Sequence, residues 1–333
     1  SDTMNYKELS NTFKKINKWY GKKTKVLSIK TRPFNTVEIF SNIINKVVGR
    51  ESNILYVFCS KKEKYAYEQQ NELYEYINET IEKEKIESKI KFIFIDEINK
   101  IDNLYDLVIF DDISLFSKSS NKYIREAIED IYWNCNKIIV YASEYIFPIG
   151  EKFEINYMPS QEPMIEPRLM NTRIKLEQDI PLSLFEYFRW FKENKRIVLI
   201  VVPSEDKLNK VYNHYYNILK ELNIRVVRYS KNQDFSFIKE IIDGYSDALF
   251  IVTNNCGQYI KNIPDVNIIM LFADDMFYSY KKILYMCAAI NVKSNIHSEA
   301  IMVSREVSEE MDKAKNMARS FNKNLWERQY LKY

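Results

Sequence analysis

The chain has 333 residues, of which 46% are hydrophobic and 29% are charged. This is roughly twice the usual ~100–200 residues of one domain, and the apolar content excludes a disordered protein. No apolar run approaches the ~18–20 residues that span a bilayer, so we expect no membrane insertion. Four scattered cysteines and two histidines argue against a zinc cluster. Buried, reduced thiols in a cytoplasmic protein fit this cysteine usage best.

Glycine is scarce, because the chain contains only five: Gly21, Gly49, Gly150, Gly244 and Gly257. Loops that cradle phosphate groups depend on glycine, since side chains prevent the close approach of the backbone. Neither GxGxxG nor GxxxxGK[ST] occurs in the sequence. The composition therefore excludes a standard Walker A loop.

The net charge of +3 is unevenly distributed. Residues 1–32 contain nine lysines and arginines against two acidic residues, and the end of the chain is basic again. Both ends contain aromatic residues, namely Trp19, Tyr20, Phe321, Trp326 and Tyr330. Basic segments with aromatic residues suit a nucleic-acid backbone and base stacking. The same pattern also fits a solvated helix face, so both interpretations stay open.

Short apolar runs alternate with amphipathic segments over the first 150 residues. Such an alternation indicates a parallel α/β sheet with helices on both faces. The expected strands are 26–29, 54–59, 90–95, 107–110 and 137–141. The expected helices are 36–48, about 64–83 and 121–134.

Five of the eight prolines lie in residues 147–182, which predicts an extended connector over 151–181. A second α/β series follows it. Its expected strands are 196–202, 224–229, 248–253, 266–271 and 299–303, and its expected helices are 182–195, 205–222, 235–242, 278–290 and a last one from about 308. The predicted organisation is a first lobe over 1–150 with a basic N-terminal segment, the connector, and a second lobe over 182–333 with a basic C-terminal helix.

Two expected strands end in paired acidic residues, Asp111-Asp112 and Asp96-Glu97. Open α/β sheets present functional side chains at the carboxyl ends of their strands. P-loop ATPases hold Mg²⁺ with an acid in this position. Each pair could also be an ordinary cap of a strand end or helix start, an interpretation that the sequence favours for Asp96-Glu97.

A nucleotide site would also need a phosphate-binding loop after the first strand. That position holds residues 30–36, which have no glycine, and Pro33 lacks an amide donor. We therefore expect at most a vestigial nucleotide site, made of Lys30, Thr31, Arg32, Thr36 and Asp111.

These features together resemble the superfamily 2 helicases, and most closely the ComFA family of helicase-like ATPases of bacterial DNA uptake. Residues 111–116 are similar to the family's DEVDAF box, although the glutamate and the second aspartate of that box are lost. Arg196–Ser204 resembles the opening strand of the second helicase lobe, and residues 250–266 resemble motif V. The resemblance implies two RecA-like lobes in tandem.

The departures from the family pattern fall on its catalytic elements. Residues 30–36 replace the ATP-binding loop, Ala142-Ser143-Glu144 replaces motif III, and residues 286–292 (MCAAINV) replace the arginines of motif VI. An arginine in that role is worth roughly 10³–10⁵ in rate. The resemblance thus implies a pseudo-helicase that has lost ATP hydrolysis, and whether ATP with Mg²⁺ still binds is left open.

In the family, loops at the strand ends contact the nucleic-acid backbone. Their counterparts here are Ser60, Lys61 and Lys62 in the first lobe, and Ser204, Ser230, Lys231, Thr253, Asn254 and Asn255 in the second. The predicted function is therefore binding of single-stranded or branched DNA without sequence preference. Two alternatives remain: a protein-interaction scaffold in a DNA-processing complex, and a weak, divergent ATPase in which Lys30 or Arg32 replaces the loop lysine and Asp111 holds Mg²⁺.

Overall fold

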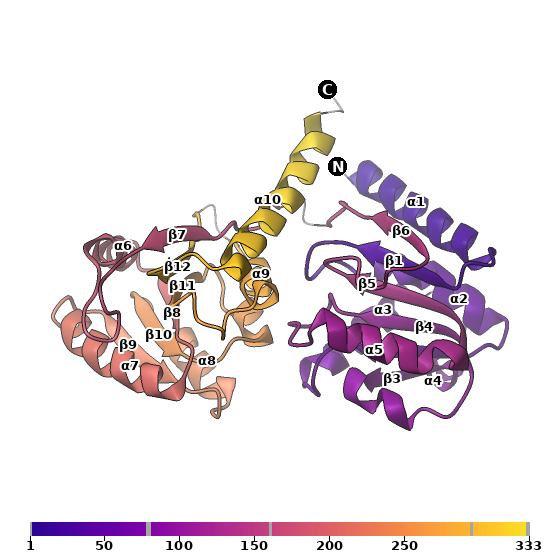
Figure 1. The fold of residues 1–333 in the computed structure, drawn as a ribbon, viewed down its shortest axis with the longest axis horizontal. Coiled ribbons are helices and arrows are strands. Elements are labelled where there is room, and N and C mark those ends of the chain that lie inside the picture. Colours follow the sequence, from indigo (N-terminus) through magenta and orange to yellow (C-terminus); the bar gives the residue numbers. More distant parts are fainter. Residues whose placement is uncertain (1, 78–80, 160–161, 294–295, 331–333) are drawn as a thin grey trace. The chain divides into compact units, whose positions relative to one another are not determined.

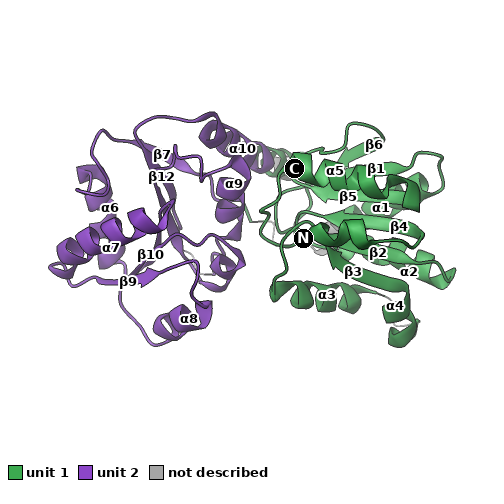
Figure 2. Ribbon diagram, turned by 60° about the horizontal axis from the view of Figure 1, so that its bottom comes forward, with its two compact units in different colours: residues 1–163, 323–333 green, residues 164–322 purple. Residues whose placement is uncertain are grey.

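The computed structural model describes residues 2–77, 81–159, 162–293 and 296–330. The chain forms two compact units (Figure 2). Unit 1 is Ser1–Pro163 with Lys323–Tyr333, and unit 2 is Met164–Asn322. The division thus lies inside the expected connector, and the end of the chain groups with the first unit.

Unit 1 contains a six-stranded sheet with the order β3-β2-β4-β5-β1-β6 (Figure 1). All neighbouring strands are parallel. The strands are β1 (Val26–Lys30), β2 (Ile54–Phe58), β3 (Ile90–Phe94), β4 (Tyr105–Asp111), β5 (Cys135–Ala142) and β6 (Glu151–Glu154). Strand β5 therefore separates β1 from β4, the strand that ends in the predicted acidic pair.

Helices cover both faces of this sheet. They are α1 (Asp2–Tyr20), α2 (Ser41–Gly49), α3 (Tyr65–Tyr76), α4 (Lys83–Lys89) and α5 (Asn121–Ile131), with 3₁₀ turns η1 (Glu38–Phe40), η2 (Ile95–Lys100) and η3 (Tyr132–Asn134). On one face Trp19 of α1 and Ile44 of α2 pack with alternate strand residues such as Ile109. On the other face Ile128 of α5 packs with Val108 and its neighbours. Strands buried on both faces read as continuous apolar runs, which is why the sequence revealed them.

Unit 2 contains a second parallel six-stranded sheet, with the order β7-β12-β11-β8-β10-β9. Its strands are β7 (Arg168–Asn171), β8 (Ile197–Val201), β9 (Arg225–Tyr229), β10 (Leu249–Thr253), β11 (Asn267–Leu271) and β12 (Ala300–Ser304). Its helices are α6 (Leu182–Glu193), α7 (Glu205–Lys220), α8 (Phe235–Asp243), α9 (Tyr280–Ala289) and α10 (Glu309–Tyr330), with the 3₁₀ turn η4 (Gln258–Asn262). Helix α10 continues past the boundary of the unit at Asn322.

One face of this second sheet packs against α6 and α7. Phe188 of α6 and Val211 of α7 are fully buried against Ile200 and Phe250 of the central strands. Ser204 caps α7, because its Oγ accepts the amide hydrogen of Lys207 at 3.2 Å. This cap places the first turn of α7 beside the carboxyl end of β8.

Three parts of the secondary structure differ from the expectation. The basic N-terminal segment is the long helix α1, and two short strands, β6 and β7, lie inside the expected connector. The helix expected over 64–83 ends at Tyr76, and a separate helix begins at Lys83; residues 78–80 lie outside the described part. Strands β6 and β7 are partly exposed edge strands, so their sequences lack an apolar run. Within the described residues, no helix combines the length and the apolar character needed to cross a membrane.

Candidate nucleotide and nucleic-acid sites

The loop after β1 is held by its own hydrogen bonds. Asn35 Nδ2 donates to Thr31 Oγ1 at 2.8 Å and to the carbonyl of Tyr157 at 2.7 Å. The Asn35 carboxamide oxygen accepts the amide hydrogen of Thr36 at 2.7 Å, and Thr36 Oγ1 accepts that of Glu38 at 3.0 Å. Thr31, Asn35 and Thr36 are all buried. The side chains of Thr31, Asn35 and Thr36 therefore form hydrogen bonds within the loop and to Tyr157.

The remaining residues of the loop also engage protein partners. Arg32 Nη1 donates to the carbonyl of Glu162 at 2.6 Å, and burial lowers the pKa of Arg32 to about 10. Phe34 has φ 64°, a conformation that favours glycine, and its amide donates to the carbonyl of Ile113 at 2.9 Å. A 3₁₀ turn follows the loop, and α2 begins only at Ser41. No α-helix thus starts directly after this loop.

Asp111, at the end of β4, is buried and accepts four hydrogen bonds. Its Oδ2 accepts from Tyr56 Oη at 2.5 Å and from Ser114 Oγ at 2.5 Å. Its Oδ1 accepts the amide hydrogens of Ile113 at 2.8 Å and of Ser114 at 2.9 Å. Burial foremost, and then the neighbouring Asp111 carboxylate, raises the pKa of Tyr56 well above its usual value. The Asp111 carboxylate thus holds the turn after β4 through hydrogen bonds and links it to Tyr56 on β2.

Asp112 and Glu97 also accept hydrogen bonds from nearby groups, whereas Asp96 is exposed. Asp112 is buried, and its Oδ1 accepts from Ser117 Oγ at 2.6 Å. Glu97 Oε2 accepts the amide hydrogen of Phe94 at 2.8 Å, which caps the 3₁₀ turn after β3. In the described part of the chain, no three His, Cys, Asp or Glu side chains lie close enough to hold a metal ion.

The predicted backbone-contacting residues of unit 1 differ in exposure. Ser60 lies buried at the end of β2, and its hydroxyl has no hydrogen-bond partner within the described residues. Lys61 and Lys62 follow it and are exposed. Ser143, in the segment that replaces motif III, is fully buried, and Glu144 accepts from Asn121 Nδ2 at 2.8 Å.

The predicted residues of unit 2 gather around Glu205, the first residue of α7. The Glu205 carboxylate accepts from Arg228 Nη2 at 2.5 Å, Ser230 Oγ at 3.1 Å and Asn254 Nδ2 at 2.9 Å. Asn254 in turn accepts the amide hydrogen of Lys231 at 2.8 Å. The structure therefore connects the ends of β9 and β10 to the start of α7. Sequence reasoning missed Glu205, which is adjacent to the predicted Ser204.

Two further predicted residues complete this end of the sheet. Thr253 Oγ1 accepts the amide hydrogen of Asn255 at 2.9 Å, and Asn255 Nδ2 donates to Tyr229 Oη at 3.1 Å. Ser230, Thr253 and Asn254 are buried, whereas Ser204 and Lys231 are exposed. A ligand approaching this end of the sheet would meet the exposed residues and Glu205 first.

The segment that replaces the motif VI arginines is mostly apolar, and its first part is buried, whereas Asn291 is exposed. The segment begins in α9, where Met286 and Cys287 are almost completely inaccessible to solvent. Burial raises the pKa of the Cys287 thiol to about 12. These side chains pack in the core and supply no charge for a phosphate group.

The aromatic residues at the two ends of the chain differ in their exposure to solvent. Trp19 is fully buried and Phe321 is 8% exposed, so neither ring is accessible for base stacking. Base stacking by these two rings, one of the two interpretations left open by the sequence, is therefore excluded, because both side chains are buried in packing. Trp326 is half exposed. The side chain of Tyr330 lies outside the described part.

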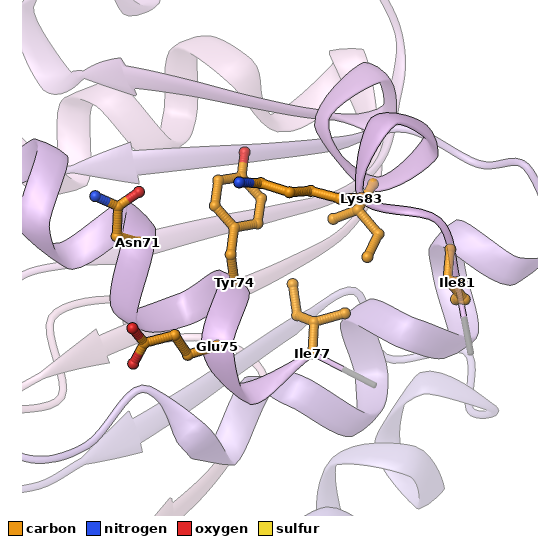
Figure 3. A pocket seen from close by; sticks show the side chains of 7 residues that line it. Asn71, Tyr74, Glu75, Ile77, Ile81 and Lys83 are labelled. Atoms are coloured by element: carbon orange, nitrogen blue, oxygen red, sulfur yellow. The ribbon is translucent and has the colours of Figure 1, made fainter. Parts of the chain in front are cut away.

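A cavity of about 440 Å³ lies away from these residues, between α3 and α4 (Figure 3). Its lining residues are Asn71, Tyr74, Glu75, Ile77, Ile81, Lys83 and Ile86. None of the predicted site residues is among them. The cavity therefore gives no support to the predicted nucleotide site.

Comparisons with known proteins place this fold. No protein-family model matches the chain, and no curated protein sequence matches it. Among solved structures, RecG bound to a three-way DNA junction has a TM-score of 0.53 at 12% identity, over 95% of this chain and 46% of that chain. Mycobacterium smegmatis Lhr, bound to single-stranded DNA and AMP-PNP, has a TM-score of 0.50 at 8% identity, over 96% and 48%. Dbp5 of S. cerevisiae, bound to RNA and ADP BeF3, has a TM-score of 0.48 at 10% identity, over 95% and 91%.

The similarity to RecG and Lhr shows the fold. The chain consists of two RecA-like lobes in tandem, similar to those of RecG and Lhr, which confirms the predicted fold class. It spans about half the length of the RecG and Lhr chains.

Proposed function

We propose that this protein binds single-stranded or branched DNA without sequence preference and does not hydrolyse ATP, as a ComFA-like pseudo-helicase. The helicase-like fold supports the nucleic-acid part, since RecG and Lhr are described as bound to a DNA junction and to single-stranded DNA. The sequence resemblance at residues 111–116 and 196–204 supports the ComFA part.

The main support for a loss of ATP hydrolysis is the Asp111 carboxylate, whose acceptor positions are already used by hydrogen bonds. An aspartate that holds Mg²⁺ directly or through water uses carboxylate lone pairs that face the nucleotide. All four principal acceptor positions of Asp111 are used by Tyr56, Ile113 and Ser114. Donors of the loop Thr31–Thr36 likewise bind protein acceptors, some within the loop and some outside it. Binding ATP there would require breaking several of these bonds.

The exposed strand-end residues support the DNA part of the proposal. Lys61, Lys62 and Lys231 are exposed cations beside hydroxyl and amide groups. Such side chains contact phosphates and position a backbone without reading bases. Because each phosphate contact releases counterions, binding through them should weaken steeply with salt.

The test is fluorescence anisotropy of labelled single-stranded DNA over a salt series. We expect tight binding at low salt, and we expect Lys231→Gln to reduce the slope of log K against log [salt] by about 0.7. Lys239→Gln, on the exposed surface of α8, is the matched control and should leave the slope unchanged. Absence of binding at low salt would overturn the DNA part.

An assay of ATP turnover tests separately the proposal that the protein does not hydrolyse ATP. We expect no ATP hydrolysis above background, with or without DNA, and no shift of the anisotropy curves on adding Mg-ATP. DNA-stimulated turnover by the unmodified protein would overturn the pseudo-helicase proposal and favour the divergent ATPase. An ATP-dependent shift without turnover would show that a nucleotide site survives.

One observation favours the second candidate function, a protein-interaction scaffold. Leu104, Trp133 and Ile149 are 73%, 84% and 70% exposed. Leu104 directly precedes β4, and Trp133 and Ile149 lie two residues before β5 and β6. All three are thus at the amino-terminal ends of strands, opposite to the strand ends that carry the predicted nucleic-acid residues of unit 1. Large exposed apolar side chains are a feature of surfaces that contact other proteins. A complex that survives nuclease treatment and is lost in Trp133→Ser would support this candidate.

A further inference from the structure

Two of the predicted nucleic-acid residues of unit 2, Ser230 and Asn254, converge on Glu205. Its carboxylate accepts hydrogen bonds from Arg228 on β9, from Ser230 just after β9 and from Asn254 just after β10. A guanidinium, a hydroxyl and a carboxamide are donors that commonly bind phosphate oxygens. In this structure all three donate to a single side-chain anion.

The carboxylate also forms the outer layer of this cluster. Ser230 and Asn254 are each 5% exposed, whereas the Glu205 side chain is 46% exposed. A phosphate group approaching from solvent therefore meets Glu205 before it reaches either donor. Arg228 is held a second time, because its Nε donates to Asn209 Oδ1 at 2.9 Å. The guanidinium is thus oriented toward the place where the carboxylate lies.

We propose that Glu205 is an internal substitute for a nucleic-acid phosphate, which a DNA backbone must displace in order to bind at the ends of β9 and β10. The inference rests on the proposed function and concerns the regulation of the same site. Displacement would release Arg228, Ser230 and Asn254 to the phosphate, and the negative charge of Glu205 would oppose binding until it moves. The carboxylate thus sets the affinity for DNA below what the donors alone would give.

The charge of Glu205 persists at neutral pH. Desolvation raises its pKa, but the hydrogen bonds from Ser230, Asn254 and Arg228 outweigh this and hold the pKa below the usual value. The competition is therefore present under ordinary assay conditions.

The central test compares Glu205→Gln with Asp206→Asn in the anisotropy assay. Both variants remove one negative charge at the start of α7, but Asp206 is exposed and pairs with Lys210 at 3.0 Å on the outer surface. We expect Glu205→Gln to tighten binding by about fivefold, the effect of one like charge at about 4 Å in water. We expect its salt slope to rise by about 0.7, which corresponds to one further phosphate contact. Asp206→Asn should change neither quantity by as much.

A second variant shows whether the released donors are used. Ser230→Ala should weaken DNA binding more in the Glu205→Gln background than in the unmodified protein. In the unmodified protein the Ser230 hydroxyl already donates its hydrogen bond to Glu205. Equal effects of Glu205→Gln and Asp206→Asn on DNA affinity would overturn the inference. Weaker DNA binding by a folded Glu205→Gln variant would also overturn it, because Glu205 would then serve to position the donors. Failure of the unmodified protein and of every variant to bind DNA would instead overturn the proposed function itself.

Discussion

Tyr56 on β2 donates a hydrogen bond of 2.5 Å to Asp111 at the end of the adjacent strand β4. Both residues are almost completely buried. The bond joins a phenol in the middle of the sheet to the acidic residue that the sequence marked as a remnant of an ATPase. Its strength bears directly on whether Asp111 is structural.

Asp111→Asn should destabilise the protein by about 2–4 kcal/mol, because a buried charge-assisted acceptor becomes an amide whose donor faces the Tyr56 and Ser114 hydroxyls. Tyr56→Phe removes one of the four bonds and should cost about 1.5–3 kcal/mol. Urea unfolding measures both values. An Asp111→Asn variant of unchanged stability would contradict a structural role for this carboxylate.

Gly150→Ala should be strongly destabilising, since Gly150 has φ 114° and a Cβ there would lie 2.3 Å from the Val26 carbonyl oxygen. The strained backbone alone costs about 1–3 kcal/mol. Gly49, at the end of α2, has no atom within 4 Å of an added Cβ, so Gly49→Ala is the control and should stabilise by roughly 0.5–1 kcal/mol. Thermal unfolding of the two variants should therefore shift in opposite directions.

Lys137→Met should loosen the C-terminal end of α1. The Lys137 ammonium group donates to the carbonyls of Lys22 and Thr24 at 2.5 Å each and lies 5.1 Å from the centre of the Trp19 ring. We expect hydrogen exchange in the last turns of α1 to accelerate by about tenfold, which equals ~1.4 kcal/mol. Lys91→Met on edge strand β3 removes an exposed lysine and should leave α1 unchanged.

Stability should fall in alkaline solution because of buried tyrosines. Burial is the largest cause that raises the pKa values of Tyr56, Tyr141 and Tyr278 well above 10.0. Above pH 10 the unfolded chain loses these phenolic protons while the folded protein keeps them, so the free energy of unfolding decreases as pH rises. Below pH 10 the phenols are protonated in both states, so these tyrosines cause no pH dependence of the free energy of unfolding. Urea titrations between pH 8 and 11 should show this slope, and Tyr141→Phe should reduce it; an unchanged slope would exclude Tyr141 as a contributor.

The sequence by itself determined the two α/β units and most of their strands. Strands such as β8 are buried on both faces, so their local composition is continuously apolar and stands out without any knowledge of their neighbours. The absence of a glycine-rich phosphate loop was also visible, because it follows from which residues are present. Residues such as Asn254 and Lys231 could be placed at strand ends for the same local reason.

The tertiary structure decided what those strand ends do. Edge strand β6 is defined by its pairing with β1, more than a hundred residues earlier, and its own sequence is polar. Tyr56 of β2 donates to Asp111 from 55 residues earlier in the chain, and Glu205 meets donors 23 to 49 residues further along the chain. Hydrogen bonds across such separations depend on sheet order and register, which set distances that no local pattern of residues encodes.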